Sequence, residues 1–88
     1  MFYAICPDDV LDYRGIYKDD LLIIHKKEAQ NGDIVLALEE DELILRVLKQ
    51  TETHLTLVSQ HDSYESISLD SNPTITIVGV VAYVMLPI

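Results

Sequence analysis

The chain has 88 residues, of which 49% are hydrophobic and 24% are charged, a composition typical of one small folded domain rather than a disordered segment. Fifteen acidic residues against six basic ones give a formal net charge of −9, so the attraction to phosphate that dominates nucleic-acid binding is missing. We therefore expect no direct contact with DNA or RNA. Cys6 is the single cysteine and excludes an internal disulfide, and no signal-peptide pattern opens the chain, so we expect a cytoplasmic protein.

Short runs of β-branched, aromatic and aliphatic residues, separated by turn-forming residues, follow one another along the chain. The strands that they predict cover residues 2–6, 20–26, 33–39, 42–49, 54–59, 64–69 and 74–85. One helical turn is expected near residues 9–15, with Asp8 or Asp9 as its cap and Gly15 at its end. The sequence therefore predicts a mostly β fold of short antiparallel strands, with residues 1–88 as one domain.

Turn signals place two of these strands side by side. Asn31-Gly32 supplies residues that tolerate a positive φ before the strand at 33–39. The acidic segment Glu39-Glu40-Asp41 is too charged to bury, so the strands at 33–39 and 42–49 are expected to form a hairpin. We interpret the acidic run as a solvated hairpin tip, with the steering of a basic partner as the alternative.

In the last run, from Ile75 to Met85, the odd-numbered and the even-numbered positions are both mostly apolar, so a strand here has two apolar faces. It is interrupted by Thr76 and Gly79 and is too short for a membrane-spanning helix, which needs about 20 apolar residues, so we expect no membrane span. A strand that is apolar on both faces needs cover on both faces. Two interpretations remain open: a central strand of a small barrel or sandwich, and a strand with one face or edge covered by a second subunit.

Arg46 stands in the middle of the apolar run ELILRVLK, residues 42–49, which otherwise predicts a buried strand. Burying an unpaired guanidinium costs several kcal/mol, on the order of the penalty for any isolated charge. Arg46 must therefore be paired, line a cleft or reach out of an edge.

Three blocks of sequence carry a resemblance to a known family. They are DDVLDYRGIYKDDLLII at 8–24, NGDIVLALEEDELILRVL at 31–48 and TITIVGVVAYV at 74–84. Together they resemble the C-terminal domain of the self-cleaving LexA and UmuD proteins, and YESI at 64–67 fits the Tyr-Ser-Pro-Ile segment of that family. The resemblance covers nearly the whole chain and implies the small β fold of that domain.

Two departures from the family pattern concern its catalytic residues. The resemblance places the nucleophilic serine of the family at Val10, which has no hydroxyl, and the general-base lysine at Arg46. A buried lysine can lose its proton, whereas a guanidinium stays protonated. The resemblance therefore implies an inactive peptidase-fold domain and no enzyme. Arg46 would then line what remains of the catalytic cleft of the family, where it is expected to bind a carboxylate. The candidates are Asp8, Asp9 and the acidic end of a bound chain.

The substrate of the family reaction is also missing. The family cuts an Ala-Gly or Cys-Gly bond in its own N-terminal arm, and neither dipeptide occurs in this sequence. Only Met1 precedes the first expected strand, so we expect neither that arm nor the DNA-binding domain of the repressors.

Other chemistry-bearing residues have simpler interpretations. Cys6 is interpreted as a small buried hydrophobe, with a substitute nucleophile as the alternative. The SQHD segment that starts at Ser59 is too compact for a catalytic triad, and a hydrolase that uses Cys6 or Ser59 is the third interpretation of function. The histidines show no pair at metal-ligand spacing, and we expect no metal and no cofactor. They are His25, His54 and His61.

The resemblance predicts a non-enzymatic regulatory protein of the bacterial DNA-damage (SOS) response. It would act as a corepressor or modulator that pairs with itself or with a LexA/UmuD-like repressor. The alternative is an accessory subunit of an error-prone translesion DNA polymerase. The resemblance also implies that family members dimerise partly through the terminal strand. The residues that we expect at this interface are Thr76, Val78, Val80, Ala82 and Val84.

Overall fold

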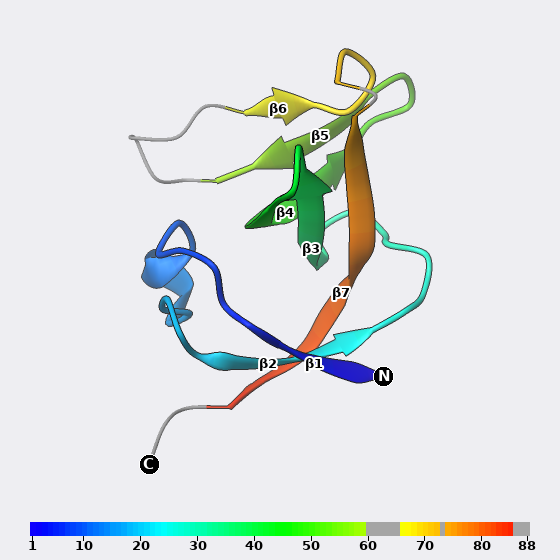
Figure 1. Ribbon diagram of the computed structural model, residues 1–88. Helices are drawn as coiled ribbons and strands as arrows, with labels where there is room; N and C mark the ends of the chain where they lie inside the picture. Colours follow the sequence, from blue (N-terminus) through cyan, green and yellow to red (C-terminus); the bar gives the residue numbers. More distant parts are fainter. Residues whose placement is uncertain (60–65, 73, 86–88) are drawn as a thin grey trace.

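The structure is a computed structural model that describes residues 1–59, 66–72 and 74–85. Its strands form one seven-stranded sheet in the order β1-β2-β7-β3-β4-β5-β6, in which every neighbouring pair is antiparallel (Figure 1). The elements are β1 (Phe2–Ile5), the 3-10 turn η1 (Asp12–Arg14), β2 (Leu21–His25), β3 (Ile34–Glu39), β4 (Glu42–Gln50), β5 (Leu55–Val58), β6 (Ile67–Ser68) and β7 (Ile75–Met85). The predicted mostly β fold with one helical turn is confirmed.

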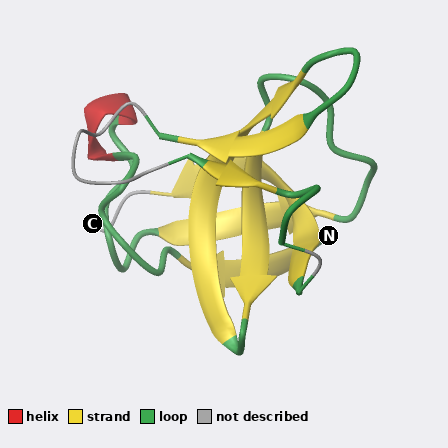
Figure 2. Ribbon diagram, turned by 90° about the horizontal axis from the view of Figure 1, so that it is seen from above, coloured by secondary structure: helices red, strands yellow, loops and turns green. Residues whose placement is uncertain are grey.

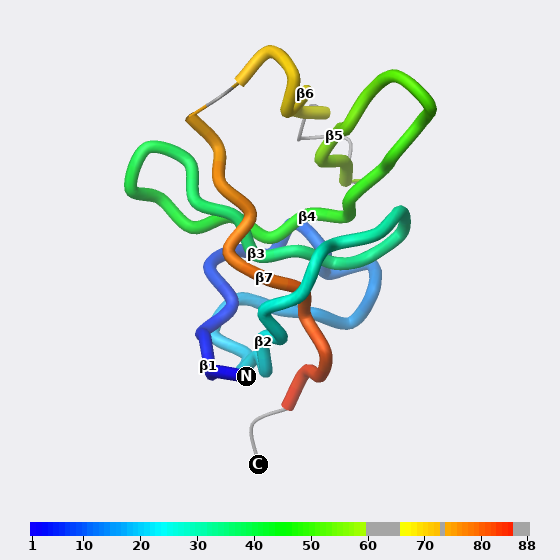
Figure 3. Tube along the Cα trace, turned by 90° about the vertical axis from the view of Figure 1, so that its right-hand side faces the viewer, coloured from blue at the N-terminus to red at the C-terminus, as the bar shows by residue number. Residues whose placement is uncertain are grey.

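β7 joins the two halves of the sheet. Its first half pairs with β3, from Ile75 to Val80, and its second half pairs with β2, from Val80 to Met85. Figure 2 shows two sets of strands that lie across each other, and Figure 3 shows β7 running from β6 at one end of the molecule to β1 and β2 at the other. β7 is therefore a central strand, as the first of the two interpretations of its sequence predicts.

Two β-bulges in β7 change which side chains share a face. Leu36 pairs with Gly79 and Ala37 with Ile77, which leaves Val78 as an extra residue. Ile23 pairs with Tyr83 and Ile24 with Val81, which leaves Ala82 as an extra residue. Simple alternation along the strand is interrupted at both places, so the odd and even positions of β7 do not form two separate faces.

The buried residues form two core clusters, and β3 and β4 contribute to both because successive side chains of a strand point to opposite faces. The β1–β2 core consists of Cys6, Val10, Leu11, Ile16, Leu22, Ile24, Leu36 and Leu45. The β4–β5 core consists of Val35, Ala37, Ile44, Leu48, Leu57 and Val80. Because of the bulges, β7 contributes Val78, Val81 and Val84 to the first cluster and Ile75, Ile77 and Val80 to the second.

The β3–β4 hairpin forms as predicted, with Glu39 paired to Glu42 and a two-residue loop between them. Both loop residues adopt positive φ angles, 46° at Glu40 and 69° at Asp41, as the twist of a tight hairpin requires. Gly32 also has a positive φ, and the side-chain oxygen of Asn31 accepts a hydrogen bond from the backbone N–H of Gln50 at 2.8 Å. The predicted turn thus also ties the start of β3 to the end of β4.

The helical turn is shorter than the predicted segment and is capped differently. Leu11 occupies the N-cap position without a side-chain hydrogen bond, so the expected capping by Asp8 or Asp9 is wrong. Gly15 ends the turn with a left-handed φ of 79°, and its N–H bonds to the carbonyl of Asp12, as expected. The carboxylate of Asp8 instead accepts bonds from the N–H of Val10 and from Arg46, and that of Asp9 accepts the N–H of Lys18. Among the described residues, no helix is long and apolar enough to cross a membrane.

Candidate functional site

Asp8 organises the segment between β1 and η1. One of its carboxylate oxygens, Oδ1, accepts a hydrogen bond from the backbone N–H of Val10 at 3.1 Å, which closes a tight turn. Its backbone carbonyl accepts a bond from the thiol of Cys6, also at 3.1 Å. The neighbouring Asp9 accepts the backbone N–H of Lys18 at 2.7 Å and so fastens the far end of the same loop. The two carboxylates hold this loop against the end of the β1–β2 core.

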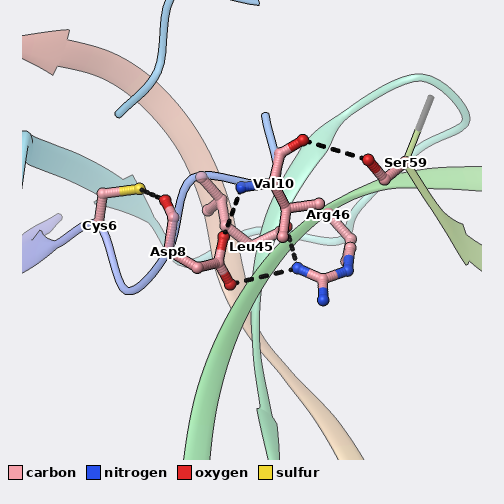
Figure 4. Close-up of polar contacts among 6 residues, drawn as sticks. All are labelled: Cys6, Asp8, Val10, Leu45, Arg46 and Ser59. Carbon is pink, nitrogen blue, oxygen red and sulfur yellow. Dashed lines mark hydrogen bonds and ion pairs between the residues drawn. The ribbon is translucent and has the colours of Figure 1, made fainter. Parts of the chain in front are cut away.

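Arg46 lies opposite this loop on β4, with a side chain that is only 8% exposed. Its Nη1 donates to the second carboxylate oxygen of Asp8 at 3.3 Å and to the carbonyl of Leu45 at 2.7 Å (Figure 4). The bond to Leu45 shows that the guanidinium turns back over the backbone of its own strand. The expectation that Arg46 binds a carboxylate is confirmed, and the carboxylate is that of Asp8, which lies 38 positions away in the sequence.

Val10 is fully buried beside this ion pair, within the β1–β2 core. The hydroxyl of Ser59, at the end of β5, donates to the carbonyl of Val10 at 3.2 Å (Figure 4). The structure therefore brings together Val10 and Arg46, with Asp8 bonded to both. Valine offers no nucleophilic atom, and a guanidinium does not accept a proton near neutral pH. Val10 therefore cannot act as a nucleophile, and Arg46 cannot act as a general base.

Cys6 is another nucleophilic group of this loop. It is buried in the β1–β2 core, and burial raises the pKa of its thiol, with the carboxylates of Asp8 and Asp20 acting in the same direction. The bond to the carbonyl of Asp8 opposes this shift but is outweighed. A thiol with a raised pKa carries little of the reactive thiolate at neutral pH. The interpretation of Cys6 as a buried hydrophobe fits this environment.

A shallow pocket of about 330 Å³ lies next to the site, between the helical turn and strands β4 and β5. Its lining residues are Tyr13, Arg14, Val47 and Val58. Val47 follows Arg46 on β4, and Val58 precedes Ser59 at the end of β5. Sequence reasoning did not single out Tyr13 or Arg14, because their place beside β4 depends on how the loop after β1 folds back.

The five residues expected at an interface on the last strand occupy different surroundings. Thr76 and Ala82 are exposed, whereas Val80 is buried in the β4–β5 core. Val78 and Val84 are half-buried against the β1–β2 core. The two bulges explain why alternate positions do not reach one common face. The involvement of these residues in pairing stays a prediction.

The histidines that the structure describes do not gather at the site. His25 is exposed at the end of β2, and the ring of His54 lies 3.3 Å from the carboxylate of Asp70 on the surface. His61 lies outside the described residues. Within the described part of the chain, no group of three or more His, Cys, Asp or Glu side chains is placed to hold a metal ion.

Comparison with known proteins defines the class to which this fold and loop belong. The model of the Peptidase S24-like family matches residues 3–82, so the chain belongs to that family. Among curated proteins, it is similar to the LexA repressor of Thermobifida fusca, with 35% identity over 93% of this chain and 31% of the repressor. It is also similar to the LexA repressor of Paraburkholderia xenovorans, with 34% identity over 74% of this chain and 34% of that protein. The chain thus spans about a third of the length of these relatives.

Proposed function

We propose that this chain is a non-cleaving member of its family, related to the SOS response, that acts by pairing with a LexA/UmuD-like repressor or with itself. The observation that carries the proposal is the Arg46–Asp8 ion pair, at 3.3 Å, beside the buried Val10. If Arg46 and Val10 stand where active relatives have a lysine and a serine, the ion pair fills the place of the dyad. A permanently charged guanidinium cannot act as a general base there.

Pairing through the last strand is supported by an open strand edge. β3 pairs with β7 only as far as Val80, and within the described residues no other strand pairs with that edge of Val81–Met85. An unpaired edge exposes a row of backbone donors and acceptors that a strand of another chain can satisfy. A LexA/UmuD-like partner would present the same kind of strand, so a mixed pair is geometrically equivalent to a self-pair.

The experiment that tests this function is the mass in solution of the purified chain, alone and mixed with LexA/UmuD-like proteins from its own source. Light scattering is expected to show a complex that contains both chains at micromolar concentration. The regulatory effect is then measured as the change in operator binding and in self-cleavage of the repressor when this chain is added. A chain that forms no complex with any of these proteins and none with itself at that concentration contradicts the proposal.

The alternative, an accessory subunit of a translesion polymerase, gains no specific support from the contacts described above. It stays a prediction that copurification with an error-prone polymerase would test. A hydrolase based on Cys6 would require a thiol that reacts readily, which its buried position and raised pKa oppose.

A further inference from the structure

The carboxylate of Asp8 lies between two donors that come from opposite sides of the site. Its Oδ1 accepts the backbone N–H of Val10 at 3.1 Å, and its Oδ2 accepts Nη1 of Arg46 at 3.3 Å (Figure 4). The first donor belongs to the loop after β1 and the second to β4. A single side chain therefore engages both positions at which the family resemblance places catalytic residues.

The backbone N–H of Val10 matters for the chemistry that a serine would carry out at this position. When a serine attacks a carbonyl, negative charge develops on the carbonyl oxygen, and the backbone N–H of the nucleophilic residue is a common donor to that oxyanion. Here the N–H already bonds to a carboxylate oxygen. A substrate carbonyl that approached it would have to displace a negative charge, which repels the developing oxyanion. The donor is therefore blocked even if a hydroxyl stands beside it.

The side chain at position 46 is affected by the second oxygen of the same carboxylate. A lysine acts as a general base only after it loses its proton, and an opposite charge within about 4 to 6 Å favours the protonated form. Oδ2 of Asp8 lies 3.3 Å from Nη1 of Arg46, whose side chain is only 8% exposed, so salt and water screen the attraction weakly. A lysine in place of Arg46 would therefore keep its proton as long as Asp8 is ionised.

Two neighbouring carboxylates and the nearby thiol are engaged elsewhere. The carboxylates of Asp9 and Asp20 accept backbone N–H groups of the segment that follows η1, at 2.7 and 2.9 Å. The thiol of Cys6 donates to the backbone carbonyl of Asp8 rather than to its carboxylate. Of these three carboxylates, that of Asp8 is the one bonded to Arg46.

We propose that Asp8 is a third inactivating residue beside Val10 and Arg46, because its carboxylate holds both the backbone N–H and the side chain that a serine and a lysine at those positions would need. The inference rests on the proposed function, since it takes positions 10 and 46 as the places of the dyad. It adds that a restored serine and a restored lysine do not suffice for cleavage. Asp8 acts through these two groups as a positioning residue, and its charge must be removed as well.

The first measurement is the pKa of a lysine introduced by Arg46→Lys, followed by NMR through its side-chain Cε signal. The titration is made with Asp8 intact and with Asp8→Asn, which keeps the shape and an oxygen acceptor but removes the charge. We expect the pKa of the introduced lysine to fall by at least about 1 pH unit with Asp8→Asn. Asp9→Asn is the matched control and should leave this pKa nearly unchanged, because Asp9 bonds to the N–H of Lys18.

The second measurement is cleavage of a LexA/UmuD-like repressor whose own catalytic serine is replaced by alanine, followed by mass spectrometry. Circular dichroism checks that each variant of this chain folds. The double variant Val10→Ser with Arg46→Lys is expected to leave the repressor intact. Addition of Asp8→Asn to the double variant should raise the rate of cleavage at least about 10-fold, because proton transfer by a general base then becomes available.

Two results would overturn the inference. One is a pKa of the introduced lysine that Asp8→Asn does not change, which would assign Asp8 a purely structural role. The other is an equal rate of cleavage with and without Asp8→Asn. Both leave the wild-type chain non-cleaving, as proposed above. The proposed function fails on different results, which are cleavage by the wild-type chain or the absence of any complex.

Discussion

At the scale of single residues, the pair formed by Arg46 and Asp8 explains how a cation is accommodated beside an apolar core. The guanidinium is almost fully buried, while the side chain of Asp8 is one quarter exposed. Removal of a charge partner from a buried ion pair leaves an uncompensated charge, which costs more than the pair contributes by itself. The two residues are therefore expected to respond unequally to substitution.

We predict that Asp8→Ala lowers the free energy of unfolding by about 1 to 3 kcal/mol, because Arg46 loses its charge partner and Val10 loses a hydrogen-bond acceptor. Arg46→Met should cost less than Asp8→Ala, since the carboxylate left behind is partly hydrated. Urea denaturation of both variants and of the double variant gives the coupling energy. A larger loss for Arg46→Met than for Asp8→Ala would contradict this account of the pair.

We also predict that the thiol of Cys6 reacts slowly in the folded protein. Burial raises its pKa, so the thiolate that reacts with alkylating reagents is scarce at neutral pH, and the side chain is also screened from solvent. Alkylation by iodoacetamide should be at least 10-fold slower in buffer than in urea, as followed by mass spectrometry. Equal rates in the two conditions would show that Cys6 is accessible.

The sequence predicted part of this site and left part of it open. The place of Arg46 in an apolar run left it to be paired, to line a cleft or to reach out of an edge. The family resemblance added a carboxylate as its partner, with Asp8, Asp9 and the acidic end of a bound chain as candidates. The choice between them depends on the loop after β1, which turns the carboxylate of Asp8 toward β4 and that of Asp9 toward Lys18. Asp8 and Arg46 lie 38 positions apart in the sequence, so no local sequence pattern shows which aspartate lies near Arg46.

At the scale of elements, the β-prone runs between turn-forming residues predicted each strand to within one residue at each end, except for the strand expected at 64–69. Residues 64 and 65 lie outside the described residues, and Ile67–Ser68 form β6. The faces of β7 did not follow from the sequence. Its residues are apolar at nearly every position, so the sequence contains no signal for the bulges at Val78 and Ala82. Gly79 marks the region of close backbone approach. A Cβ atom at Gly79 would collide with Cγ2 of Ile24 and would lie 3.1 Å from the carbonyl oxygen of His25.

We predict that Gly79→Ala destabilises the protein by about 1 to 3 kcal/mol through overpacking between β2 and β7. Ala82→Ser, at an exposed position of the same strand, serves as the control and should change the stability by less than about 0.5 kcal/mol. Thermal unfolding of the two variants makes the comparison. Equal midpoints for Gly79→Ala and wild type would show that the strands separate there without cost.

The β3–β4 hairpin offers a stabilising substitution. Glu40 and Asp41 both adopt positive φ angles, which glycine and asparagine tolerate better than glutamate. We predict that the double substitution Glu40→Asn and Asp41→Gly raises the stability by about 1 kcal/mol, in part because it also removes two negative charges beside the Glu39–Glu42 pair. Urea denaturation measures the change, and a loss of stability would contradict the assigned turn geometry.

At the scale of the whole molecule, the chain corresponds to about a third of the length of the repressors that it resembles. Its two core clusters share the strands β3, β4 and β7, and the end of β7 carries both an open edge and the exposed side chains of Tyr83 and Met85. The sequence anticipated that this strand needs cover on both sides. It did not show where apolar side chains stay exposed, which in the structure is at Tyr83 and Met85, near the end of β7.

The central claim is that this chain pairs with a LexA/UmuD-like repressor without cutting it or itself. Native mass spectrometry of the chain incubated with a repressor whose own catalytic serine is replaced by alanine tests both parts at once, because any cleavage must then come from this chain. The account predicts one complex in which both chains keep their intact masses. Free chains without a complex, or new fragments of either protein, would contradict it.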